Sequence, residues 1–140
     1  MKFTTDKTFI DTNVLFYAFI PFKAEKSHIA MEKIKELATR RALVLSTQVL
    51  QEFHHNFVKK GGASIEDSAN LVKMFVKNIV VENGVEHVLN AIQIQKRHQL
   101  SFWDSLIISS AASAKCKYLL SEDLNDGQKI EGVKIVNPFL

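Results

Sequence analysis

The stretch FIDTNVLFYAF, residues 9–19, places an aspartate, a threonine and an asparagine inside an otherwise apolar segment. Its first two residues are both apolar, as in a strand buried on two faces, so we expect a strand over Lys7–Asp11. The apolar residues that follow predict a short helix over Val14–Ile20, which ends before Pro21. Asp11 therefore lies where a buried strand ends, and its carboxylate is either a helix cap or part of a site.

Downstream of this stretch, short apolar runs alternate with segments in which apolar residues recur at helical spacing. The further strands that we expect are Ala42–Leu45, Ile79–Val81, Tyr118–Leu120 and Val133–Val136. The further helices are Lys26–Arg40, a segment between Ser46 or Thr47 and Gly61, Glu66–Phe75, Val85–His98 and Ser101–Lys115. Such alternation favours a parallel sheet covered by helices. We therefore expect an α/β fold, with one domain over residues 1–140 and a parallel-stranded central sheet flanked by helices on both faces.

Composition narrows the class of protein. The chain has 140 residues, of which 46% are hydrophobic and 24% charged, as is usual for a soluble domain. The single cysteine, Cys116, cannot form an internal disulfide, which fits a cytoplasmic protein. Met1–Lys7 lacks the apolar core of a signal peptide, and the longest apolar run, Val14–Ile20, is too short to cross a membrane. The net charge of +3 permits a polyanionic partner without predicting one.

Several carboxylates fall where a parallel sheet binds its ligands, outside the carboxyl ends of the strands. Asp11 and Asp123 each follow a predicted strand, Glu52 lies on the helix after the second strand, and Asp104 lies in the first turn of the Ser101–Lys115 helix. Each residue also has an ordinary structural explanation: a helix cap, a turn, an exposed helical glutamate and, for the sequence SFWD, a capping box.

The combination of these carboxylates favours a metal site. Asp104 shares a helix face with Ile107, Ile108 and Ala111, so we expect its side chain to point toward packed interior. Carboxylates gathered at one sheet edge repel one another and raise each other's pKa. A divalent cation removes that repulsion, and oxygen ligands favour Mg²⁺ or Mn²⁺ over Zn²⁺.

Four segments, FIDTNVL, STQVLQEF, SFWDSLIISSA and YLLSEDLNDG…VKIVNPF, together resemble the PIN-domain family, and specifically its toxin ribonucleases of the VapC type. The resemblance spans almost the whole chain and preserves the order and spacing of the motifs. It implies a PIN-like fold with an acidic catalytic quartet. The residues that it assigns are Asp11, Glu52, Asp104 and Asp123 as catalytic, Asp11, Asp104 and Asp123 as metal ligands, and Asn13, Ser121 and Asp126 as supporting residues.

The resemblance further implies an activity and partners. The activity is endonucleolytic hydrolysis of RNA with Mg²⁺ or Mn²⁺, and the protein would be the toxin of a type II toxin–antitoxin pair. The partners are an RNA substrate, an antitoxin that covers the active site and a second copy of the chain. The basic residues that could contact phosphates are Lys23, Lys26, Arg40, Arg41, Lys59, Lys60, Lys96 and Arg97. Trp103 could stack on a base, although we expect it to pack in the core beside Phe102 and Leu106.

Two other functions remain open at this point. The chain could be an RNA-binding protein of the same fold that does not cleave, or a magnesium-dependent phosphoaspartate-type phosphotransfer domain. The latter needs a lysine at the site and leaves Glu52 and Asp104 unexplained. The metal-site interpretation makes a geometric prediction: Asp11 should face a cleft containing the other three carboxylates, while Thr12 or Asn13 can satisfy the start of the helix.

Overall fold

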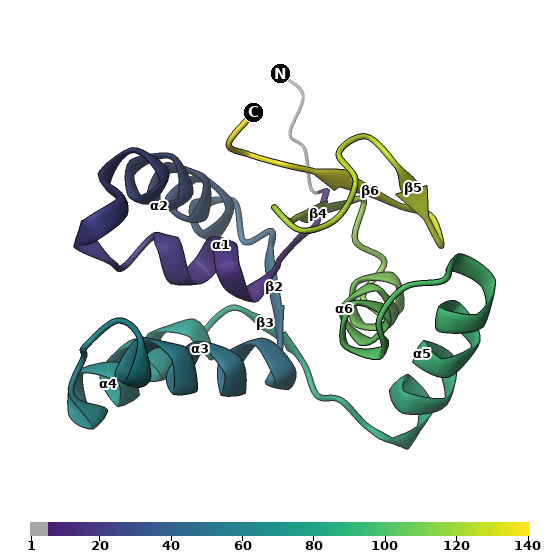
Figure 1. Cartoon of the computed structure of the whole chain (residues 1–140), viewed down its shortest axis with the longest axis horizontal. Coiled ribbons are helices and arrows are strands. Elements are labelled where there is room, and N and C mark those ends of the chain that lie inside the picture. The colour runs from purple at the N-terminus through teal and green to yellow at the C-terminus, as the bar shows by residue number, and fades with distance from the viewer. Residues whose placement is uncertain (1–5) are drawn as a thin grey trace.

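A computed structural model describes residues 6–140 as an α/β domain (Figure 1). Residues 1–5 lie outside the described residues. Two expectations therefore fall partly outside them: the start of the domain at residue 1, and the absence of a signal peptide from Met1–Lys7. Within 6–140, no helix is long and apolar enough to span a bilayer. The strands are β1 (Thr8–Ile10), β2 (Leu43–Ser46), β3 (Ile79–Val81), β4 (Tyr118–Leu120), β5 (Lys129–Ile130) and β6 (Val133–Val136). The helices are α1 (Thr12–Tyr17), η1 (Pro21–Lys23, a 3₁₀ turn), α2 (Ala24–Thr39), α3 (Thr47–Lys59), α4 (Ile65–Phe75), α5 (Val85–His98) and α6 (Phe102–Ser113).

The six strands form one sheet in the order β3-β2-β1-β4-β6-β5. Every neighbouring pair is parallel except β5 and β6. Figure 1 shows α1 to α4 on one side of the strands and α5 and α6 on the other. The predicted α/β class, with a parallel-stranded sheet between helices, is confirmed.

The position of β1 in the sheet explains where a ligand can bind. β1 lies between β2 and β4, so the order of strands along the chain reverses between β1 and β4. A crevice forms outside the carboxyl ends of strands at such a reversal. Ile10 is paired with Leu120, and the amide of Asp11 donates a 3.0 Å hydrogen bond to the Leu120 carbonyl. The residues that follow β1 and β4 are thereby held side by side at this crevice.

The apolar residues of the strands and inner helix faces form the core that fixes this arrangement. Phe9 and Ile10 of β1 are fully buried, as their adjacent positions predicted. Phe53 of α3 is fully buried too, and its ring contacts the rings of Phe19 and Phe75 edge-on or nearly so and stacks on that of Phe57. This aromatic cluster secures the helix that carries Glu52.

Two expectations about local structure were wrong. The first helix covers Thr12–Tyr17 rather than Val14–Ile20, because Asp11 caps it from the strand end. Strand β5 was not expected at all. It is joined to β6 by Glu131 and Gly132, both with positive φ (51° and 82°). Two such residues form the tight turn that suits a hairpin, so the glycine after Glu131 was the available signal.

Candidate active site

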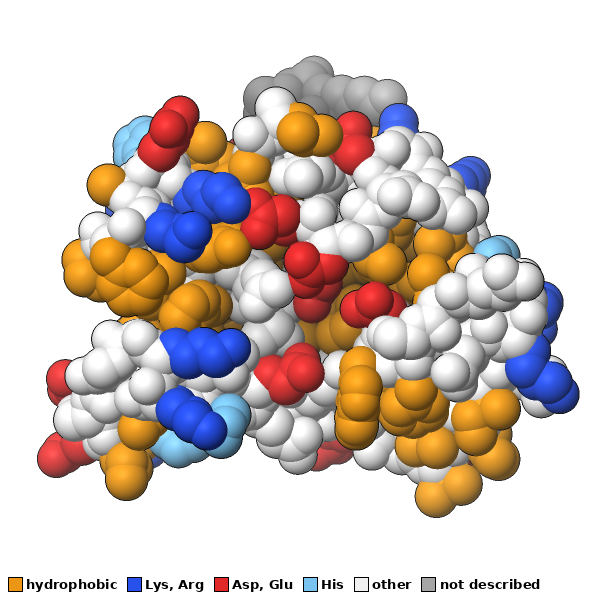
Figure 2. Space-filling view, in the orientation of Figure 1, with side chains coloured by type: hydrophobic (Ala, Val, Ile, Leu, Met, Phe, Trp, Pro, Cys, Tyr) orange, Lys and Arg blue, Asp and Glu red, His pale blue; other side chains and the backbone are white. Residues whose placement is uncertain are grey.

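Acidic side chains gather in a hollow at the centre of the face shown in Figure 2. The pocket there has a volume of about 120 Å³. It is lined by Asp11, Thr12, Asn13, Gln48, Glu52, Asn56, Trp103, Asp104, Ile107 and Asp123. The lining brings together the four predicted catalytic carboxylates, from four separate segments, and includes no lysine, arginine or histidine. A larger, shallower depression of about 710 Å³ lies along α2, away from these carboxylates, on the charged surface of a single helix.

Asp11 occupies both roles that its sequence position allowed. It is the N-cap of α1, and its Oδ1 accepts a 2.7 Å hydrogen bond from the Thr12 amide. The hydroxyl of Ser121 donates to its Oδ2 at 2.9 Å. The expectation that Thr12 or Asn13 would satisfy the helix end was therefore wrong, since Asp11 does so itself while its second oxygen faces the Ser121 loop.

The environment of Asp11 disfavours its charged form. The residue is only 8% exposed. Burial is the main cause that raises the pKa of Asp11 to about 6, and the neighbouring charges of Asp104 and Asp123 raise it further against the lowering effect of the hydrogen bonds from Ser121 and Thr12. A cation in the pocket would reverse this balance.

Glu52 is oriented by Thr12, a residue that was expected only at the start of the helix and not as a partner of Glu52. The hydroxyl of Thr12 donates a 2.7 Å hydrogen bond to Glu52 Oε1. Thr12 is buried in the first turn of α1, and Glu52 lies in the second turn of α3, so the bond joins the two helices across the pocket. Glu52 is partly buried, and its head group reaches the pocket.

Asp104 lies in the first turn of α6, whose N-cap is Ser101. The Ser101 hydroxyl accepts a 3.1 Å hydrogen bond from the Asp104 amide, as the SFWD capping motif predicted. The Asp104 side chain is half-buried and lines the pocket, so the expectation that it points into packed interior was wrong. Burial raises the pKa of Asp104, hydrogen bonding to Ser101 lowers it and the charge of Asp123 raises it.

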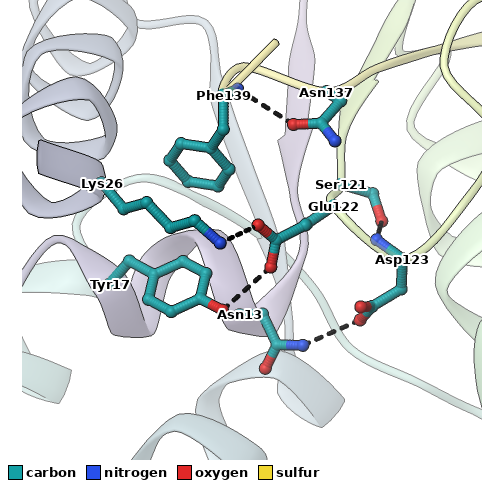
Figure 3. A network of polar contacts seen from close by, with 8 residues as sticks. All are labelled: Asn13, Tyr17, Lys26, Ser121, Glu122, Asp123, Asn137 and Phe139. Carbon is teal, nitrogen blue, oxygen red and sulfur yellow. Dashed lines mark hydrogen bonds and ion pairs between the residues drawn. The ribbon is translucent and has the colours of Figure 1, made fainter. Parts of the chain in front are cut away.

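Asp123 is exposed and is held by two polar neighbours (Figure 3). The Asn13 amide group donates a 2.8 Å hydrogen bond to Asp123 Oδ2, and the Asp123 backbone amide donates to Ser121 Oγ at 3.3 Å. Asn13 and Ser121 thus each contact a carboxylate residue, which is the arrangement expected of supporting residues.

The neighbouring Glu122 fastens the same loop to the first two helices (Figure 3). Tyr17 Oη donates to Glu122 Oε1 at 2.9 Å, and Lys26 forms an ion pair with Glu122 Oε2. The Lys26 ammonium also lies over the rings of Tyr17 and Phe139. Burial raises the pKa of Glu122, but the hydrogen bonds from Lys26 and Tyr17 outweigh it and lower the pKa overall. The backbone just before Asp123 is therefore restrained.

Other candidate residues lie elsewhere. Asp126 does not line the pocket; its Oδ1 accepts a 2.8 Å hydrogen bond from the Asn137 amide, and its supporting role remains a prediction. Of the basic residues proposed for phosphate contact, Lys26, Arg40 and Arg97 already pair with glutamates. The expected core packing of Trp103 was wrong, because the residue is 61% exposed at the pocket.

The pocket was tested for its fit to a divalent metal. In the described part of the chain, no three His, Cys, Asp or Glu side chains lie close enough together to enclose a metal ion by themselves. Mg²⁺ binds through one or two carboxylates and keeps several waters, so it does not need such an enclosure. The donors here are carboxylate and amide oxygens, and a cation among them would offset the burial and the neighbouring charges that raise the pKa of Asp11. These residues fit a hydrated Mg²⁺ or Mn²⁺ ion.

Comparison with known proteins gives an independent result. The search of curated proteins returned no match. One similar solved structure is a toxin–antitoxin complex from Klebsiella pneumoniae, with 16% identity and a TM-score of 0.71, covering 94% of this chain and 98% of that one. Another is DNA-bound VapBC from Salmonella typhimurium, with 20% identity and a TM-score of 0.64, covering 92% of this chain and 96% of that one. A third is Mycobacterium tuberculosis VapC20, described as a toxin that cleaves the sarcin–ricin loop, with 16% identity and a TM-score of 0.64, covering 84% of this chain and 92% of that one. At these identities the likeness shows a shared fold.

The sequence itself matches the model of one protein family. The PIN-domain model covers residues 8–128, from the first residue of β1 to the turn before β5. The match includes all four carboxylates that line the pocket. The predicted resemblance is thereby confirmed, and the chain belongs to the PIN-domain family.

Proposed function

We propose that this protein is a metal-dependent endoribonuclease and the toxin of a type II toxin–antitoxin pair. The observation that carries the proposal is the pocket at the β1–β4 crevice, where four carboxylates from separate segments gather without a lysine or arginine in the lining. The family match and the toxins among the similar structures support the same function. A phosphoaspartate mechanism is disfavoured by the absence of lysine from the pocket lining.

The pocket residues divide into two roles. Asp11, Asp104 and Asp123 would hold Mg²⁺ or Mn²⁺, directly or through its waters. The bound ion would supply positive charge for the scissile phosphate and lower the pKa of water. Glu52 would orient the attacking water, because its Oε1 is fixed by the Thr12 hydroxyl while its Oε2 has no hydrogen bond to a described residue. Asn13 and Ser121 would keep Asp123 and Asp11 in place.

The direct test measures cleavage of single-stranded RNA by the purified chain, free of antitoxin, with Mg²⁺, Mn²⁺ or EDTA. We expect discrete cuts with either metal and none with EDTA. Asp11→Asn, Asp104→Asn and Asp123→Asn should each lower the rate at least 100-fold, and Asp67→Asn, at an exposed carboxylate of α4 outside the pocket, is the matched control. Equal rates for the wild type and Asp11→Asn would reject the catalytic assignment.

The proposal includes three statements about the cell. Similar structures contain toxin–antitoxin complexes, so we propose an antitoxin that covers this pocket. We propose a homodimer because α5 exposes the apolar side chains of Val85, Leu89 and Ile92. We place the protein in the cytoplasm because its one cysteine, Cys116, is a buried thiol.

Expression in bacteria tests the toxin assignment. The wild type should arrest growth and produce discrete RNA cuts, and Asp11→Asn should do neither at the same protein level. RNA binding without metal-dependent cleavage would instead support the non-cleaving alternative. An acid-stable, hydroxylamine-labile adduct on one aspartate would support the phosphoaspartate alternative.

A further inference from the structure

Gln48 is a buried polar residue in the pocket whose hydrogen bonding is incomplete. It is 5% exposed and lies in the first turn of α3, one turn before Glu52. Its Nε2 donates a long 3.4 Å hydrogen bond to the Trp103 carbonyl, while its Oε1 is buried without a hydrogen-bond partner among the described residues. The orientation of the amide is fixed, because the opposite one would direct Oε1 at the Trp103 carbonyl oxygen. An unpaired buried acceptor destabilises the free protein, and a ligand with a hydrogen-bond donor can remove that cost.

Trp103 lies next to this acceptor and presents an open aromatic surface. Its side chain is 61% exposed although it lines the pocket. The ring of Phe102 lies 5.1 Å from the Trp103 ring at an interplanar angle of 77°, so this neighbour covers at most one of the two faces of the indole. A large apolar ring exposed beside a polar pocket is the feature on which proteins stack single-stranded bases.

A polar face of α3 runs from Gln48 past Glu52 to the last turn of the helix. At about 100° per residue, Gln48, Glu52, Asn56 and Lys59 fall within an arc of about 80° on that helix. Glu52 and Asn56 line the pocket with Gln48, and Lys59 is exposed in the last turn. At about 1.5 Å per residue, Lys59 lies about 10 Å along the axis from Glu52, a distance that a neighbouring phosphate of an extended strand can reach. This face offers a path for a nucleic-acid strand.

We propose that Trp103 and Gln48 form a nucleotide-binding subsite beside the carboxylates. The base of a nucleotide next to the scissile phosphate stacks on the Trp103 indole, and a donor of that nucleotide hydrogen-bonds to Gln48 Oε1. The donor is a base N–H or the ribose 2′-hydroxyl. The subsite rests on the proposed ribonuclease function, and it gives that function a means of selecting the position of the cut.

Chemistry favours a nucleotide over a simple anion as the occupant. The nearest charged groups, Glu52 and Asp104, are carboxylates and repel an anion. A nucleotide instead offers an apolar face to Trp103 and a donor to Gln48, and it keeps its phosphate toward the metal-binding part of the pocket. Losing either contact should weaken binding about tenfold, which corresponds to about 1.4 kcal/mol.

The experiment uses the fact that Trp103 is the only tryptophan in the chain. We would titrate the whole chain, as Asp11→Asn with Mg²⁺ to prevent cleavage, with tetraribonucleotides and record tryptophan fluorescence. Stacking should quench it in a saturable manner. In the same background, Gln48→Ala should weaken binding about tenfold. Gln51→Ala is the matched control, because Gln51 is exposed on the same helix and outside this pocket. Gln48→Met, which preserves side-chain length, serves if Gln48→Ala does not fold.

The outcomes distinguish a base N–H from the ribose 2′-hydroxyl as the donor to Gln48, when the titration is repeated with tetradeoxyribonucleotides. They also distinguish failure of the subsite from failure of the ribonuclease function. Loss of RNA-over-DNA preference in Gln48→Ala supports the 2′-hydroxyl, and loss of preference among bases supports a base N–H. Absence of quenching, or equal binding by Gln48→Ala and Gln51→Ala, overturns the subsite even if the wild type cleaves RNA. Quenching and Gln48-dependent binding with no cleavage by the wild type would reject the ribonuclease function and retain a nucleotide-binding site.

Discussion

Replacing Asp11 by Asn should make the metal-free protein more stable at neutral pH, although it removes a residue of the proposed active site. The pKa of Asp11 is raised from 3.8 to about 6, mainly by burial. A pKa raised by about 2 units means that ionised Asp11 lowers the free energy of unfolding by about 3 kcal/mol at a pH well above 6. The folded state holds the proton of Asp11 more tightly than the unfolded state does. The loss of stability is therefore absent at low pH and develops as the pH rises from about 4 to 6.

The hydrogen bonds of Asp11 reduce the gain. An asparagine keeps the acceptor for the Thr12 amide, and its Nδ2 can donate to Ser121 Oγ. The Ser121 hydroxyl, which is buried and also accepts from the Asp123 amide, then loses the acceptor for its own hydrogen. We assign about 1 kcal/mol to that loss. The net expectation is a variant about 2 kcal/mol more stable than the wild type at pH 7.5. At pH 4, where the gain has largely disappeared, the variant should be less stable than the wild type by up to about 1 kcal/mol.

The assay is urea unfolding in EDTA at pH 4 and pH 7.5, with thermal unfolding as a second readout. A gain of about 2 kcal/mol corresponds to a rise in Tm of about 4–8 °C for a domain of this size. Asp67→Asn, at an exposed carboxylate of α4 outside the pocket, is the control for a general effect of removing one negative charge. Mg²⁺ or Mn²⁺ should stabilise the wild type more than Asp11→Asn and so reduce the difference in stability between the two proteins at pH 7.5. A variant less stable at pH 7.5 in EDTA, or an equal difference at both pH values, would refute the reasoning.

Three further predictions concern residues around the site. Asn13→Ala should lower the cleavage rate about tenfold with a change in stability below about 1 kcal/mol, measured by kinetics and urea unfolding, because it frees the exposed Asp123 carboxylate. A rate equal to that of the wild type would show that Asn13 does not position Asp123. Lys26→Met should lower stability near neutral pH, because it removes the ion pair that lowers the pKa of Glu122, and the difference should shrink in acid as Glu122 is protonated; urea unfolding against pH measures this, and a constant difference would contradict it. Phe53→Ala should cost about 3–5 kcal/mol, since the ring is fully buried among three others; a loss below about 1 kcal/mol by urea unfolding would mean that the cluster does not secure α3.

Local sequence patterns were sufficient for the order of elements and for the sheet type. Two adjacent apolar residues in Thr8–Ile10, and similar runs in later strands, indicate burial on both faces, which parallel strands require. The caps at Ser46 and Ser101 were equally local, because a capping hydroxyl binds an amide three residues away. Strand β5 was missed because two residues carry too short a pattern to be recognised.

The tertiary structure decided how the site residues meet and which others join them. Ser121 reaches Asp11 and Asn13 reaches Asp123 across a separation of 110 residues, since β1 and β4 pair in parallel register. Thr12 reaches Glu52 because α1 and α3 pack together. The exposure of Trp103 and the unpaired Oε1 of Gln48 also depend on how α6 meets α3. The local pattern of apolar residues is enough to predict that Asp11 ends a buried strand. Its other properties depend on the packing of distant segments, because these segments bury its carboxylate, bring Ser121 to one of its oxygens and place three other acids around the same pocket.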